Sequence, residues 1–117
     1  METWIGFIFL LNIAFITIHE LDAVYQKEWR VFFGWTPLSD EAGYQLFTAL
    51  HVPLLLWILW NVQSTPFQIG FDLFLIIHAG VHWGLRNHPL VKFNNWFSRF
   101  WIFGGALLGI VHLGLLL

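Results

Sequence analysis

Histidines near the ends of apolar segments give this sequence the means to bind a metal ion. His19 and Asp22 follow an apolar run, and their three-residue spacing places both on one helix face. His78 and His82 are four residues apart, the spacing by which one helix offers two imidazoles to one ion. Together with His51 they form a mixed histidine and carboxylate set, which favours non-haem iron, manganese or zinc. We therefore predict a metal site whose ligands come from these five residues.

Glu20 is the candidate catalytic residue beside this predicted ligand set. At about 100° per helical residue, Glu20 is turned away from His19, so its carboxylate could act on a bound water and not on the ion. We predict that Glu20 is a general base. If the protein is an enzyme, this chemistry indicates a non-haem metal oxidoreductase whose lipidic substrate reaches the site laterally from the bilayer.

A second polar pair is expected at the opposite ends of two other apolar segments. Asp72 lies about six residues into one segment and His112 about six residues from the end of another, so antiparallel helices would bring them to one depth. Gly105 and Gly109 share a helix face with His112 and form a small-xxx-small stripe, which lets helices approach closely. We interpret Asp72 and His112 as a structural polar pair.

The composition indicates that these residues belong to a membrane protein. Of the 117 residues, 58% are hydrophobic and only 10% are charged, far from the composition of an ordinary soluble domain. A membrane-crossing helix needs about 20 mostly apolar residues. Four segments meet this requirement and predict one all-α integral membrane domain over residues 1–117, a four-transmembrane-helix bundle with up-down-up-down topology: residues 3–24, 42–61, 67–85 and 95–117.

The basic residues predict the orientation of this bundle. All five lie after the first segment, or between the third segment and the first turn of the fourth: Lys27, Arg30, Arg86, Lys92 and Arg99. By the positive-inside rule that side is cytoplasmic, so both termini lie outside. We expect a bacterial inner membrane or an equivalent such as the thylakoid membrane. The four histidines then share one layer on the cytoplasmic side.

Three further acids lie outside the predicted ligand set. Because they are close in sequence to Lys27 and Arg30 or to the start of the second segment, we expect them to be solvated or to cap helices: Glu28, Asp40 and Glu41.

Haem or chlorophyll binding is the alternative cofactor prediction for the histidine layer. His51 opposite His19 or His78 could supply one axial imidazole to each face of a haem. However, His78 and His82 point the same way and cannot ligate one haem from opposite faces, so an ion is favoured. A hydrogen-bonded polar network without metal, which would fix helix register, is the structural alternative. A small transporter that uses histidine and acid relays is another.

Membrane lipid is the expected partner, and the chain could also form a homo-oligomer or a subunit of a larger membrane complex. The net charge of −2 and the lack of a Lys/Arg cluster argue against a nucleic-acid partner. Cysteine is absent, which excludes disulfides, iron–sulfur clusters and thiolate zinc.

Two resemblances follow from the motifs. The HxxxH pair near a helix end is similar to that of histidine-box membrane hydroxylases and desaturases, which oxidise lipidic substrates through a di-metal site. This chain is much smaller and lacks their HxxHH boxes, so the resemblance is confined to the pair. The motifs HELDAVYQKEWR, HVP, HAGVHWGLRNHP and KFNN resemble the signature of a small bacterial four-helix membrane family of unknown function. That resemblance covers nearly the whole chain, implies the same topology and brings no activity. It singles out His19, Glu20, Asp22, His51, His78, His82 and His88.

Overall fold

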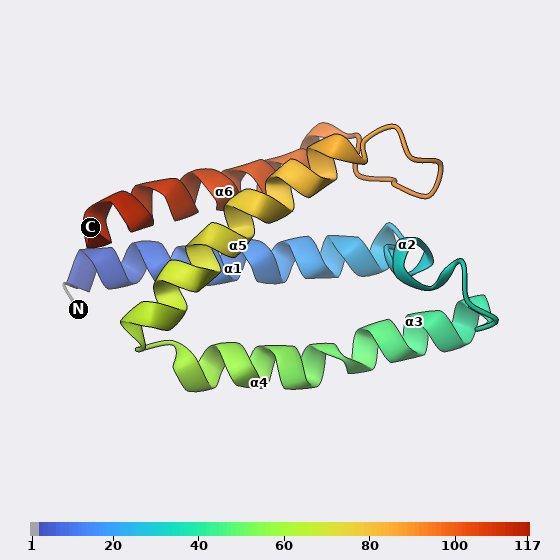
Figure 1. The fold of residues 1–117 in the computed structure, drawn as a ribbon, viewed down its shortest axis with the longest axis horizontal. Coiled ribbons are helices and arrows are strands. Elements are labelled where there is room, and N and C mark those ends of the chain that lie inside the picture. Colours follow the sequence, from blue (N-terminus) through green and yellow to red (C-terminus); the bar gives the residue numbers. More distant parts are fainter. Residues whose placement is uncertain (1–2) are drawn as a thin grey trace.

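The computed structural model describes residues 3–117, and every regular element in that range is a helix (Figure 1). The elements are α1 (Thr3–Tyr25), α2 (Trp29–Phe33), α3 (Asp40–Ala49), α4 (His51–Asn61), α5 (Thr65–Gly84) and α6 (Trp96–Leu116). The ends of the four predicted segments are displaced by no more than two residues. The all-helical prediction is therefore confirmed for the described residues.

Three helices are long and apolar enough to cross a membrane: α1, the continuous span Asp40–Asn61 formed by α3 and α4, and α6. This result indicates a membrane protein. The fourth predicted segment forms α5, which has 20 residues but is not one of the three because polar residues lower its hydropathy. Those residues include Gln68, Asp72, His78 and His82. Four crossings therefore stay a prediction.

Side-chain caps fix where the long helices begin. Ser39 accepts a hydrogen bond from the backbone N–H of Ala42 at 3.1 Å and caps α3. Asn95 accepts one from the backbone N–H of Ser98 at 2.8 Å and caps α6. Each cap satisfies a backbone donor that has no partner in the first helical turn.

The second predicted helix is interrupted at Leu50, between α3 and α4. Pro53 lacks the N–H that would bond to the carbonyl of Ala49, so the ladder breaks here, as expected from the sequence. His51 becomes the first residue of α4, and its Nδ1–H donates to the carbonyl of Phe47 at 2.8 Å. The interruption thus fixes both the position and the tautomer of His51.

Helices α1, α5 and α6 form the packed part of the molecule, with α6 in contact with both α1 and α5. The span α3–α4 packs mainly on α2, and Ile58 is the only residue of α4 that is buried. Figure 1 shows that α1 begins and α6 ends at the same end of the molecule, where α4 also connects to α5. Helix α2 and the α5–α6 connection lie at the opposite end, which carries the basic residues.

The glycines of α6 allow this close packing. A Cβ added at Gly109 would lie 3.3 Å from the backbone oxygen of Asp72, whereas one added at Gly114 would meet nothing within 4 Å. We expect Gly109→Val to lower the free energy of unfolding by about 1–3 kcal/mol, because α5 and α6 must separate. Gly114→Val introduces the same side chain without the clash and should have a smaller effect. Thermal unfolding in one detergent compares the two variants, and equal losses would contradict this role of Gly109.

Candidate metal centre

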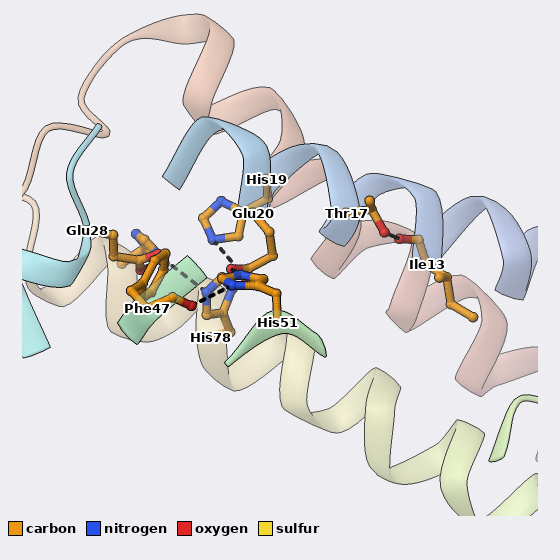
Figure 2. A network of polar contacts seen from close by, with 9 residues as sticks. Ile13, Thr17, His19, Glu20, Glu28, Phe47, His51 and His78 are labelled. Atoms are coloured by element: carbon orange, nitrogen blue, oxygen red, sulfur yellow. Dashed lines mark hydrogen bonds and ion pairs between the residues drawn. The ribbon is translucent and has the colours of Figure 1, made fainter. Parts of the chain in front are cut away.

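Four side chains from three parts of the chain converge at the basic end of the molecule. His19 comes from α1, His78 and His82 come from α5, and Glu28 immediately precedes α2. One ligand atom from each residue can be chosen so that all four lie within 4.8 Å of one another. Figure 2 shows His19, Glu28 and His78 around this point. The structure therefore brings together three of the predicted histidine ligands and one carboxylate.

Two separations between these candidate ligand atoms are close to those around a small ion. The Nε2 atoms of His78 and His82 share a hydrogen bond at 3.1 Å, and His82 Nε2 is 3.5 Å from Glu28 Oε1. Two ligands bound at about 2.0–2.1 Å to one tetrahedral ion lie about 3.3 Å apart. The four ligand atoms lie within 4.8 Å of one another, so the widest pair would close by up to about 1.5 Å to complete such a shell.

His19 is the most constrained member of the group. Its side chain is fully buried, and neither ring nitrogen has a hydrogen-bond partner among the described residues. The His19 ring packs edge-on against His78 and His82, with ring centroids 4.8 and 5.1 Å away. Phe93 closes the other side, 5.6 Å from His19 and 4.8 Å from His82. A buried imidazole without a hydrogen-bond partner is unfavourable. An ion bound by a ring nitrogen of His19 would remove this cost.

Glu28 is the member of this group for which the prediction of a solvated or capping role is wrong. It is 8% exposed and not solvated, and its Oε1 points at His82. The cause is the turn after α1, where Lys27 adopts a left-handed backbone with φ 60°. The N–H of Glu28 then bonds to the carbonyl of Ala23 at 3.0 Å and that of Lys27 to Val24 at 3.2 Å. This Schellman turn reverses the chain and aims Glu28 inward. A left-handed lysine has no reliable sequence signal.

Glu20 and His51 form a separate pair beside the group. Their Oε2 and Nε2 atoms are 2.6 Å apart, and a dashed line marks this contact in Figure 2. Because the Nδ1–H of His51 donates to Phe47, a further proton must lie between His51 and Glu20 to form this bond. Glu20 Oε1 also lies 3.9 Å from His19 Nε2. Glu20 thus lies next to the candidate ligand group. His51 forms a hydrogen bond with Glu20 and lies outside that group.

Asp22 is also outside the ligand group. It is 8% exposed, and its Oδ1 accepts a hydrogen bond from Gln26 Nε2 at 3.5 Å, one turn further along the chain. Asp22 lies about one helical turn from His19, as predicted. However, the carboxylate that lies in the candidate ligand group is that of Glu28.

The predicted contact between Asp72 and His112 is present and joins α5 to α6. The Nδ1–H of His112 donates to Asp72 Oδ2 at 2.6 Å, and the amide of Asn12 on α1 donates to Asp72 Oδ1 at 3.3 Å. All three residues are fully buried. The carboxylate of Asp72 therefore connects the three packed helices. Its hydrogen bonds are strong because they lie in apolar surroundings, away from water.

An apolar cavity of about 350 Å³ adjoins the ligand group. Its charged or polar lining is confined to Glu20, Glu28, His78 and His82, and the remaining wall is apolar. Phe74 and Ile77 of α5 belong to that wall and are 52% and 64% exposed on the molecular surface. The cavity therefore extends from the candidate ligands to an exposed apolar surface of α5, which lipid would cover in a membrane.

These contacts and the fold define a class of protein: a small all-helical membrane protein with a candidate histidine and glutamate metal centre. Within that class, the chain belongs to the Family of unknown function (DUF6713), whose model matches residues 5–117. The match confirms membership of a family of unknown function over nearly the whole chain. Comparison with curated proteins and with solved structures yields no match.

Proposed function

We propose that this protein is a four-span membrane metalloprotein in which His19, His78, His82 and Glu28 hold a divalent ion on the cytoplasmic side. The observation that carries the proposal is the convergence of four ligand atoms within 4.8 Å around a buried histidine whose ring nitrogens have no hydrogen-bond partner among residues 3–117. Register-fixing alone does not require three imidazoles to meet at one point.

Helix α5 is the fourth crossing in this proposal. Its 20 residues extend about 30 Å, the thickness of the hydrocarbon core. Gln68 and Asp72 on this helix are 1% and 0% exposed, whereas its outward residues Phe74 and Ile77 are apolar. Polar groups that face protein and apolar groups that face outward are the arrangement expected of a membrane helix. The positive-inside rule then places both termini outside.

The donor set fits iron, manganese or zinc. Imidazole nitrogen suits zinc and iron, and a carboxylate oxygen favours the harder ions iron and manganese. The four protein ligands would fill the tetrahedral coordination shell of zinc. Iron or manganese, which binds more ligands, would keep open positions for a further ligand. A haem or chlorophyll fits less well, because His19, His78 and His82 point to one spot and leave no slot for a ring between them.

The cavity beside the ligands supports a non-haem metal oxidoreductase that acts on a lipidic substrate. When bound, the ion would supply redox or Lewis-acid chemistry at the polar end of the cavity. The apolar wall formed by Phe74, Ile77 and their neighbours would bind a hydrocarbon chain that arrives from the bilayer. Glu20, held by His51, is placed to accept or donate a proton at that polar end.

Glu28 gives the sharpest test, because the sequence alone does not assign it to the site. We expect protein purified in mild detergent to carry stoichiometric iron, manganese or zinc, measured by metal mass spectrometry, without Soret-type absorption bands. Glu28→Gln should lose most of that metal, since an amide binds cations far more weakly than a carboxylate. Glu41→Gln removes the same charge from an exposed position and should keep it.

Two results would overturn the proposal. Soret-type bands in the purified protein would assign the histidines to a tetrapyrrole. A wild-type protein that binds none of the three metals, even after incubation with each, would leave the polar layer as a structural network.

A further inference from the structure

A second cavity, of about 510 Å³, lies at the basic end of the molecule and has a different character. Three of the five basic residues of the chain line it, and no acid does. Lys27 and Arg30 come from the turn after α1 and from α2, and Lys92 comes from the α5–α6 connection. Because these residues are far apart in sequence, the fold alone creates the basic cluster.

Lys27 is held in a conformation that its side chain disfavours. It is the one non-glycine residue among 3–117 with a positive φ, a conformation that costs an L-residue about 1–2 kcal/mol. Glycine is the usual residue at this position of a Schellman turn. A lysine here indicates a use for the ammonium group, because the turn itself would form more readily with glycine.

The positive charge of the cavity comes mainly from its two lysines. Arg30 is engaged by Asp40, which accepts hydrogen bonds from its Nε and from its terminal nitrogen, each at 2.8 Å. These bonds raise the pKa of the Arg30 guanidinium. Lys27 and Lys92 are exposed, and neither forms a salt bridge within 4.0 Å to another described residue. The Asp40 carboxylate, which accepts hydrogen bonds from Arg30 and Trp29, also interacts with the Lys27 ammonium at longer range. Two ammonium groups outside direct salt bridges thus line one cavity.

The rest of the lining is suited to an amphipathic ligand. Tyr25, Pro89 and Leu90 add apolar and aromatic surface beside the lysines. The cavity lies at the end of the bundle that the positive-inside rule assigns to the cytoplasmic surface, where anionic lipid headgroups are found. We propose that this cavity is a binding site for a phosphate group, held by Lys27 and Lys92.

The two remaining basic residues provide a matched control. Arg86 and Arg99 lie on the same side of the membrane but around the Trp83 ring, with guanidinium carbons 4.1 and 5.9 Å from its centroid. Neither lines the cavity. A control with Arg86→Gln and Arg99→Gln changes the net charge as much as Lys27→Gly with Lys92→Gln, so the two double variants separate a built site from general surface charge.

Native mass spectrometry of the protein released from detergent counts bound phosphatidylglycerol, and phosphorus NMR titration with inorganic phosphate tests the soluble source. We expect wild type to retain one phosphatidylglycerol, the lysine double variant to bind it at least 10-fold more weakly, and the arginine control to bind as wild type. If inorganic phosphate binds equally well and displaces the lipid, the site is the same but the ligand is a soluble phosphate. Lys27→Gly should not lower the melting temperature, because glycine relieves the left-handed strain.

Three outcomes would overturn the phosphate site. One is wild-type binding by the lysine double variant. Another is an equal loss in the arginine control, which would show that general surface charge causes the effect. The third is binding of neither probe by the wild type. The metal content of each variant, measured in parallel, keeps this result separate from the fate of the metal centre, since Lys27 precedes the candidate ligand Glu28.

Discussion

His82→Gln is expected to reduce metal affinity by at least about 100-fold, because loss of an outer-shell partner alone typically reduces it by about 10–100-fold and His82 is a proposed direct ligand. The prediction follows from geometry: His82 Nε2 lies 3.1 Å from His78 Nε2 and 3.5 Å from Glu28 Oε1. Replacing His82 removes the candidate ligand that lies between His78 and Glu28. Competition against a chelator of known affinity, followed by metal analysis of the protein, measures the change.

His88→Gln is the matched control for His82→Gln. His88 is exposed in the α5–α6 connection, and its Nδ1 accepts a hydrogen bond from the backbone N–H of Leu90 at 3.1 Å. Its replacement should leave metal affinity unchanged. Equal affinities for the His82 variant and the wild type would place the ion elsewhere. Circular dichroism shows whether the His82 variant keeps its helices, and metal affinities are compared only for folded protein.

Asp72→Ala should lower the free energy of unfolding by about 3–5 kcal/mol, because it leaves His112 and the amide of Asn12 buried without their acceptor. The carboxylate joins α1, α5 and α6 through two hydrogen bonds, and each of the three residues is fully buried. Reversible unfolding in mixed micelles measures the difference. Asp72→Asn keeps a carbonyl oxygen that accepts from His112 and should lose only about 1–3 kcal/mol.

Metal binding distinguishes this structural pair from the candidate centre. Asp72 lies six residues before His78 on α5, a rise of about 9 Å, so a folded Asp72→Asn protein should keep wild-type metal content. Full metal loss in a folded Asp72→Asn variant would show that the two polar groups form one functional unit, contrary to the roles assigned here.

The sequence predicts the helices and much of the site because both depend on local rules. Apolar length, the caps at Ser39 and Asn95, and the i, i+4 spacing of His78 and His82 can each be read within one helix. The contact between Asp72 and His112 follows from equal depth in antiparallel helices, which hydrophobic matching fixes.

The position of Glu28, the candidate carboxylate ligand, could not be predicted in this way. Glu28 reaches the group only because Lys27 takes a left-handed conformation that residue type does not favour. Likewise, whether His51 lies in the candidate ligand group or beside Glu20 depends on the rotation of α4 after its break at Leu50. Asp22 and His19 differ by enough rotation on α1 that their side chains contact different residues. The backbone conformation at Lys27 decides the position of Glu28, rotation along α1 that of Asp22, and packing of α4 against α1 that of His51.

X-ray absorption spectroscopy of the metal-loaded protein counts the ligands of the proposed ion. We expect a first shell of nitrogen and oxygen at about 2.0–2.1 Å, with multiple-scattering features from three imidazoles, and a drop to two imidazoles in His19→Ala. A shell composed of oxygen alone, a count of one imidazole or none, or a spectrum that His19→Ala leaves unchanged would contradict the proposed metal centre.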